Sequence, residues 1–179
     1  GPDSAGGPGG GLDGCGGDAN AATDFCLQLD EALEELQAEL IVILDDVDLS
    51  LLTRSFLTRR MGRALVMHAS LLPSFPGMNP VEAALQSGVC ITGCTVSFAV
   101  PPASLGSGKL CFGPHILQEA TRISVEDTAT SLRQRIVDDC ESPVLPRAVQ
   151  LVACGSVALR RDDGGYGLGR SSSFCEASS

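Results

Sequence analysis

Two short apolar runs constrain the fold of this chain more than any other feature. The segments "LIVIL" (40–44) and "RALVMH" (63–68) are too short for core helices and are typical of strands. Strands without polar alternation are buried on both faces, as in parallel sheets that helices cover on both sides. Helical spacing over 49–61 separates the two runs. The sequence therefore predicts a strand–helix–strand unit of an α/β protein.

The segments around this unit continue the alternation of helices and strands. Pro80 and Gly88 stand where each favours a helix terminus, Gly93 is a candidate bulge, and Ser124 to Asp127 has the pattern of a helix cap. The expected elements are helices over 24–39, 79–88, 124–140 and 142–155, and strands over 89–100, 114–123 and 156–161. We expect a layered mixed sheet that is flanked by helices.

The chain has 179 residues, which is enough for one hydrophobic core. We expect a single domain over 23–161. Glycine, alanine, proline and aspartate dominate residues 1–22, and the same argument applies to 162–179: such segments bury too little apolar surface to offset the entropy of ordering them. Both are expected to be flexible tails.

Charge and hydropathy exclude several functions. The chain carries 12 basic and 22 acidic residues, a formal net charge of −10, and has no basic run that would attract nucleic acid or an anionic membrane. Its apolar runs of about five residues are far shorter than a membrane span. Residues 1–22 lack the basic and apolar regions of a secretory signal, so the sequence favours the cytoplasm, with an organelle as the alternative.

The eight cysteines do not predict a disulfide framework or a metal site. They are scattered through apolar segments, and we expect reduced, mostly buried thiols. Cys90 and Cys94 share one face of an expected strand, but no Cys-x-x-Cys pair or nearby second histidine joins them. No metal cofactor is therefore expected.

Three motifs at matching intervals resemble glycinamide ribonucleotide (phosphoribosylglycinamide) formyltransferase. They are "HASLLPSF" from His68, "TGCTVSF" from Thr92 and "ILQEA" from Ile116, and the similarity extends over about 27–159. The resemblance implies a formyltransferase-like fold without the family's N-terminal βα units and their phosphate-binding loop. It also implies formyl transfer from 10-formyltetrahydrofolate to glycinamide ribonucleotide, in de novo purine biosynthesis.

The resemblance implies one catalytic residue in place of three. His68 matches the family's catalytic histidine, whereas Val66 stands at its asparagine and Cys111 at its aspartate. Valine cannot donate a hydrogen bond, and a thiol is neutral at its ordinary pKa. No Asp or Glu lies between Glu82 and Glu119, so a shifted alignment does not restore the acid.

The resemblance also implies binding residues. Leu49, Leu51 and Leu52 match apolar positions of the folate pocket, and Glu141 matches an acid near the ribonucleotide. Glu141 follows Asp138 and Asp139, and the alternative to substrate binding is that these acids form a solvated helix end.

Two interpretations of His68 remain, and three of the whole chain. His68 is either a base for formyl transfer or a structural residue that a backbone carbonyl satisfies at a strand end; for His115, in a predicted strand, a structural role is expected. The chain is a formyltransferase with impaired or absent activity, or a pseudoenzyme that serves as a subunit of a larger assembly, or a piece of a longer chain. The second interpretation implies a protein partner that completes or covers the sheet.

Overall fold

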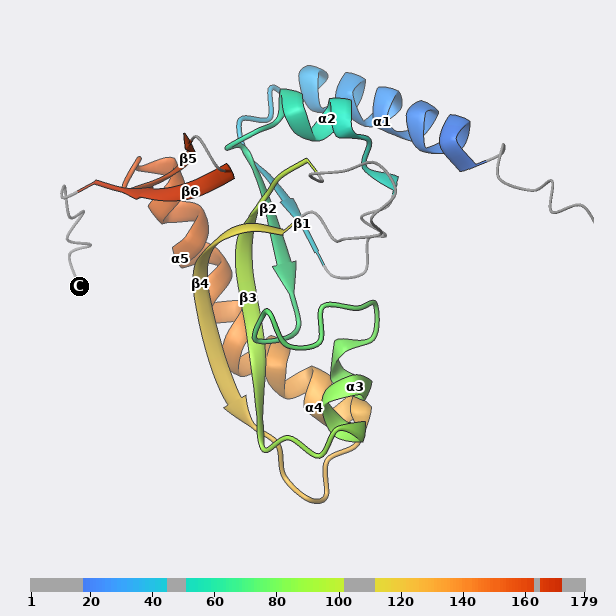
Figure 1. Ribbon diagram of the computed structural model, residues 1–179, viewed down its shortest axis with the longest axis vertical. Helices are drawn as coiled ribbons and strands as arrows, with labels where there is room; N and C mark the ends of the chain where they lie inside the picture. The colour runs from blue at the N-terminus through green and yellow to red at the C-terminus, as the bar shows by residue number, and fades with distance from the viewer. Residues whose placement is uncertain (1–17, 45–50, 102–111, 163–164, 172–179) are drawn as a thin grey trace, which may run out of the picture.

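A four-stranded mixed sheet in the order β1-β2-β3-β4 forms the centre of this computed structural model (Figure 1). The structure describes residues 18–44, 51–101, 112–162 and 165–171. Strands β1 (Ile41–Ile43) and β2 (Ala64–His68) are parallel, while β3 (Ile91–Ala99) runs antiparallel to β2 and to β4 (Phe112–Arg122). The predicted α/β fold with a mixed sheet is confirmed.

Helices lie on both faces of this sheet and along one end of it. They are α1 (Asp18–Glu35), α2 (Arg54–Arg59), α3 (Pro80–Gln86), α4 (Ala129–Ile136), the π-helical turn η2 (Val137–Glu141) and α5 (Ser142–Ala153). Pro80 begins α3, and Gly88 beyond its end has a φ of +66°, which glycine adopts without strain. Both predicted helix ends are confirmed. Among the described residues, no helix has the length and apolar character needed to cross a membrane.

The alternation of side chains along β2 divides the core into two clusters. Leu65 and Met67 belong to a cluster with α3, α4, η2 and α5, whereas Ala64 and Val66 face the opposite way and pack with α1 and α2. Strand β2 is buried at all five positions, as its uninterrupted apolar run predicted. His68 follows Val66 by two residues and so lies on the α1–α2 face of the sheet.

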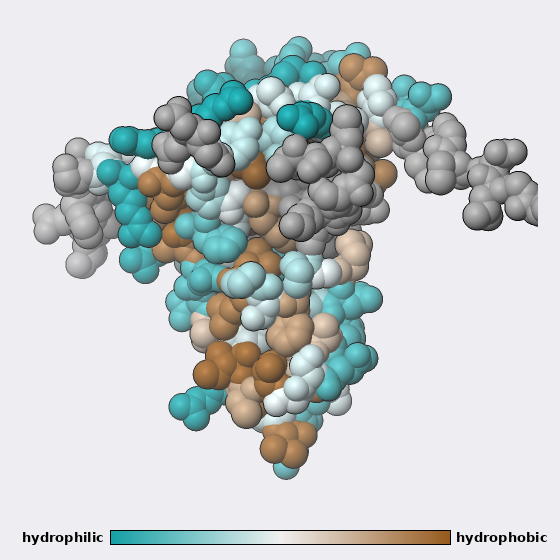
Figure 2. All heavy atoms as spheres, viewed as in Figure 1, coloured by the Kyte–Doolittle hydropathy of each residue, from teal (hydrophilic) through white to brown (hydrophobic). Residues whose placement is uncertain are grey.

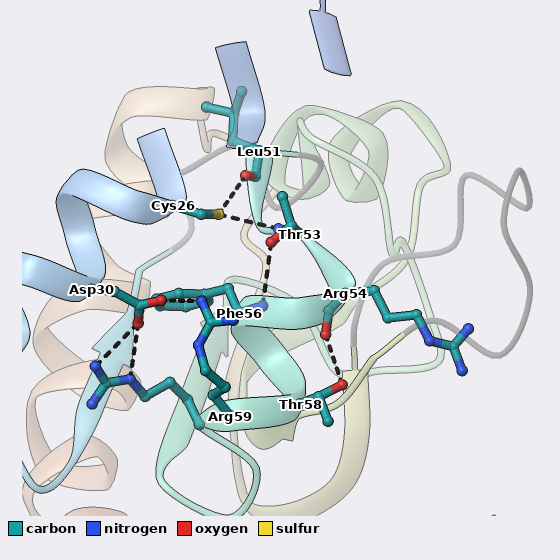
Figure 3. A network of polar contacts seen from close by, with 9 residues as sticks. Cys26, Asp30, Leu51, Thr53, Arg54, Phe56, Thr58 and Arg59 are labelled. Carbon is teal, nitrogen blue, oxygen red and sulfur yellow. Dashed lines mark hydrogen bonds and ion pairs between the residues drawn. The ribbon is translucent and has the colours of Figure 1, made fainter. Parts of the chain in front are cut away.

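Helix α1 is held on this face by polar contacts to α2 and to the segment before it (Figure 3). The Asp30 carboxylate, which is buried, accepts hydrogen bonds from the guanidinium groups of Arg59 and Arg60. The buried Cys26 thiol donates to one backbone carbonyl and accepts from one N–H within residues 51–53, each at 3.2 Å. Because the Asp30 carboxylate and the Cys26 thiol are largely removed from water, loss of their partners would leave them unsatisfied.

Both expected tails contain regular structure. Helix α1 begins at Asp18 rather than near residue 24, and β6 (Gly165–Arg170) pairs with β5 (Val157–Asp162) as an antiparallel hairpin. Residues 18–22 and 165–170 therefore form a helix and a strand that the sequence did not predict. Backbone hydrogen bonds to β5 stabilise β6 although its glycine-rich sequence has low strand propensity. The other parts of the expected tails lie outside the described residues, apart from Asp162, which ends β5, and Ser171.

The predicted bulge is displaced along β3. Gly93 pairs regularly with Ala120, and the irregular register lies between Val96 and Ala99. A Cβ atom on Gly93 would stand 1.9 Å from the Glu119 carbonyl oxygen. Glycine at 93 thus permits close approach of β4 rather than an extra residue in the strand.

The start of α4 differs from its predicted cap. Thr128 caps the helix, with reciprocal bonds between its side chain and backbone and those of Ser131. Asp127 precedes this cap and accepts hydrogen bonds from Arg135, the Ser124 backbone N–H and the Ser131 hydroxyl. The Arg135 guanidinium, followed by the Ser124 N–H, holds the pKa of Asp127 well below its usual range.

We expect Asp127→Asn to lower the melting temperature at neutral pH. A depressed carboxyl pKa stabilises the fold above the unfolded value of about 4, and this stabilisation is lost as pH falls through the lower folded value. The difference between wild type and Asp127→Asn should therefore shrink in melting curves below about pH 4. Glu126→Gln, at an exposed neighbour without such bonds among the described residues, is the control. A difference that is constant from pH 7 to pH 2 would contradict the assignment.

Candidate functional site

His68 ends β2 and is almost completely buried, with 3% of its surface exposed. Its Nε2 lies 2.9 Å from the Phe75 carbonyl oxygen, a partner to which this nitrogen donates. The ring also contacts Phe112, with a centroid separation of 5.1 Å. This is the carbonyl contact that the structural interpretation of His68 expects, and the catalytic role of His68 stays a prediction.

The segment 70–75 beyond His68 is fastened to the sheet by Thr95 of β3. The Thr95 hydroxyl donates to the Ser70 carbonyl at 2.7 Å and accepts from the Leu72 N–H at 3.0 Å. Gln118 of β4 donates to the same hydroxyl at 2.9 Å and to the Leu72 carbonyl at 3.0 Å. A fully bonded hydroxyl thus holds the turn that carries the partner of His68.

Two rows of paired residues cross the sheet at this position. One row contains Val66, Ser97 and His115, and the adjacent row contains His68, Thr95 and Gln118. Directly paired residues point to the same face of a sheet, so all six lie on the α1–α2 face. Within the first row, the Ser97 hydroxyl lies 2.9 Å from Nδ1 of His115.

The predicted folate-pocket residues occupy different environments. Leu52 is buried at 6% exposure and packs in the same cluster as Val66, on the face of the sheet that carries His68. Leu51 is 36% exposed, and its carbonyl oxygen is the acceptor for Cys26. Leu49 lies outside the described residues. The structure therefore brings one of the three onto the face of His68, and their ligand remains a prediction.

Glu141 lies away from this face. It belongs to η2, which packs with the opposite cluster, and it is buried at 7% exposure in an ion pair with Arg133. The solvated helix end that was the alternative interpretation does not describe this residue. Its predicted role in substrate binding stays a prediction, and the structure does not bring it together with His68.

No disulfide joins two of the described cysteines, and they form no metal site. Cys26, Cys94 and Cys140 are buried, whereas Cys90 and Cys154 are exposed, and the reduced state of these thiols stays a prediction. Burial raises the pKa of Cys94 to about 12 and of Cys140 to about 11, with further contributions from neighbouring thiol and acidic groups. Buried thiols of this kind are protonated at neutral pH and are poor nucleophiles. Within the described ranges, no group of three His, Cys, Asp or Glu residues is placed to hold a metal ion.

Sequence reasoning missed the polar rows that surround His68. The segments that contain Thr95, Ser97 and Gln118 were predicted to be strands. The bulge between Val96 and Ala99, however, changes which residues of β4 pair with the end of β3. Period-2 alternation along β3 could have placed Thr95 and Ser97 on one face. The partner in β4 could not be found because the register depends on the bulge.

The surface of the molecule separates into polar and apolar regions (Figure 2). In this view, hydrophilic residues gather over α1 and α2, while hydrophobic surface lies over the lower ends of β3 and β4. Ile91 at the start of β3 is 56% exposed, and Val125 after β4 is fully exposed. Apolar surface thus lies at the end of the sheet where β3 begins, and α1 exposes further hydrophobic residues, such as Leu27 at 54%.

Comparison with known proteins gives several relatives, among them a purine biosynthetic protein, a methionyl-tRNA formyltransferase and a formyltetrahydrofolate deformylase. The chain is 37% identical over 137 residues to the trifunctional purine biosynthetic protein adenosine-3 of Gallus gallus, covering 76% of this chain and 13% of that protein. It is 34% identical over 119 residues to a formyltetrahydrofolate deformylase of Synechocystis sp., covering 66% of this chain and 38% of the relative. The chain thus spans less than half the length of these two relatives.

Solved structures and a family model agree with these relatives. The crystal structure of phosphoribosylglycinamide formyltransferase from Anaplasma phagocytophilum matches with a TM-score of 0.66 and 30% identity, covering 83% of this chain and 66% of that chain. The family model described as formyl transferase matches residues 18–149, from the start of α1 into α5. Since this match covers most of the chain, the protein belongs to the formyl transferase family.

Proposed function

We propose that this chain is a cytoplasmic, phosphoribosylglycinamide formyltransferase-like domain of de novo purine biosynthesis. It binds a ligand of the 10-formyltetrahydrofolate class, and its formyl transfer to glycinamide ribonucleotide is slow or absent. The observation that carries the proposal is the pair of His68 and Val66 on one face of β2: the histidine is retained, and the position two residues before it is a buried valine.

The chemistry of formyl transfer gives this pair its meaning. When an amine attacks the formyl carbon, negative charge develops on the formyl oxygen, which requires a hydrogen-bond donor. A proton carrier and an anion that orients it are also needed. Val66 supplies no donor, and a thiol, Cys111, stands where the resemblance implies the anion. Loss of one such donor typically lowers the rate by about 10²- to 10³-fold.

The decisive experiment is a formyl-transfer assay together with titration of a 10-formyl folate analogue. We expect saturable binding of the analogue and a rate at least about 100-fold below that of an ordinary phosphoribosylglycinamide formyltransferase. Turnover near the ordinary rate would contradict impaired activity. Failure of the analogue to bind at high concentration would contradict the ligand class.

Variants at position 66 test the reason for the low rate. Val66→Asn places a donor two residues before His68 and should raise the rate by about tenfold or more in the fraction that folds, a smaller gain than the full donor effect. Val66→Ala is the matched control, since it disturbs the same packing without adding a donor. Both rates are normalised to the folded fraction from thermal melts. Equal rates in the two variants would show that position 66 does not limit transfer.

One observation favours a second candidate, a pseudoenzyme that serves as a structural or interaction subunit. Strand β1 is the outermost strand of the sheet, and within the described ranges it pairs only with β2. Leu44 beside it is 46% exposed, and Leu27 of α1 is 54% exposed. A strand of a partner protein could add to this edge.

The subunit candidate predicts that the folate analogue does not bind, and that the β1 amides become protected from hydrogen exchange in the assembly. Analogue binding without such protection would contradict it.

A further inference from the structure

Ser97 of β3 and His115 of β4 form a polar pair that neither the predicted chemistry nor the packing of the core uses. The serine is fully buried, and its hydroxyl lies 2.9 Å from Nδ1 of the histidine, which is exposed to solvent. Among the described residues, Ser97 is the one hydrogen-bond partner of the His115 ring. The pair therefore connects a buried hydroxyl inside the sheet to an imidazole ring at the surface.

The sheet places this pair beside His68. His115 shares a row with Val66, and His68 lies two residues farther along β2 on the same face. Two strand spacings separate β4 from β2, about 10 Å. The row that lacks a donor at Val66 thus contains a histidine at its other end.

The hydrogen bond determines which nitrogen of His115 carries the proton. A fully buried hydroxyl needs an acceptor for its hydrogen, and the Nδ1 of His115 is the acceptor that the structure provides for Ser97. In the neutral imidazole, the proton then lies on Nε2. Partial burial lowers the pKa of His115, which favours this neutral form at pH 7.

The other donors on this face are already engaged. Nε2 of His68 bonds to the Phe75 carbonyl, and the Thr95 hydroxyl donates to the Ser70 carbonyl. The side-chain amide of Gln118 donates to Thr95 and to the Leu72 carbonyl. Within the two rows, His115 is the residue whose N–H remains available to a ligand among the described contacts.

We propose that His115, oriented by Ser97, donates a hydrogen bond from Nε2–H to the formyl oxygen of a formylated folate. This assignment rests on the proposed function, because that function supplies the ligand. It makes His115 a specificity-determining residue that distinguishes a folate carrying a formyl group from one without it. Ser97 is a positioning residue that acts through His115.

The test compares two ligands, a 10-formyl folate analogue and the same analogue without the formyl group, by isothermal titration. We expect His115→Phe, which keeps a ring but removes the donor, to weaken binding of the formylated analogue by about tenfold, the size of one net hydrogen bond. Binding of the unformylated analogue should change less than twofold. His115→Gln retains an N–H and should restore part of the affinity for the formylated analogue. Ser97→Ala should weaken binding of the formylated analogue and leave binding of the unformylated one unchanged.

A second measurement does not depend on a ligand. The ¹⁵N chemical shifts of the His115 ring should show the proton on Nε2 in the wild type and a mixture of tautomers in Ser97→Ala. A proton on Nδ1 in the wild type would overturn the proposal whether or not a ligand binds.

The titrations separate failure of this inference from failure of the proposed function. If His115→Phe leaves the affinities for both analogues unchanged, or lowers them equally, the formyl contact is wrong and the proposed ligand class stands. If the wild type binds neither analogue, the ligand class fails, and the formyl contact fails with it. If His115→Phe loses affinity for the formylated analogue alone, the result supports both the formyl contact and the proposed ligand class.

Discussion

Gly93→Ala is expected to destabilise the fold more than any other single methyl addition in the sheet. An added Cβ would stand 1.9 Å from the Glu119 carbonyl oxygen and 2.8 Å from the Ala120 Cα atom, and both of these atoms belong to the backbone. Relief of the overlap requires β3 and β4 to separate, which breaks hydrogen bonds between paired residues. We expect a loss of about 3 kcal/mol or more in the free energy of unfolding.

Urea denaturation of Gly93→Ala, beside wild type and Gly77→Ala, measures this effect. A Cβ on Gly77 meets nothing within 4 Å, so the control makes the same chemical change without an overlap. Its midpoint should stay close to that of the wild type, because surface changes of this kind usually shift stability by less than about 0.5 kcal/mol. Equal midpoints for the two variants would show that β3 and β4 are not packed at the spacing found here.

Removal of the Thr95 hydroxyl is the second large expected effect. Thr95→Val should lower the free energy of unfolding by about 3 kcal/mol, because the Ser70 carbonyl, the Leu72 N–H and the Gln118 amide would lose their partner. The change also releases the 70–75 segment, whose Phe75 carbonyl holds His68.

Thr92→Val makes the same change three residues earlier in the same strand and should have the opposite sign. The side-chain oxygen of Thr92 is buried and has no hydrogen-bond partner among the described residues. Its replacement removes an unsatisfied polar group, and we expect stability to rise by about 1 kcal/mol. Melting temperatures of the two variants against wild type provide the test. A similar decrease in the melting temperatures of both variants would show that the hydrogen bonds of Thr95 do not explain the effect of Thr95→Val.

Much of the architecture follows from local pattern. The apolar runs of β1 and β2, and Pro80 and Gly88 at the ends of α3, predicted their elements because each signal acts over a few residues. The missed strand β6 has a glycine-rich sequence, and its pairing with β5 depends on backbone hydrogen bonds that no side-chain pattern records. The same limit explains Gly93, whose need for a small side chain comes from the approach of Glu119 on a different strand.

The sequence by itself determined the α/β class, the formyl transferase resemblance and the contrast between His68 and Val66, since all three depend on residue type and spacing along the chain. Tertiary structure decided the surroundings of His68. It placed the Phe75 carbonyl against Nε2, Glu141 in the opposite layer, and the Ser97–His115 pair on the same face as His68. These contacts depend on strand register and on the bulge in β3, which join residues distant in sequence, so no local pattern contains them.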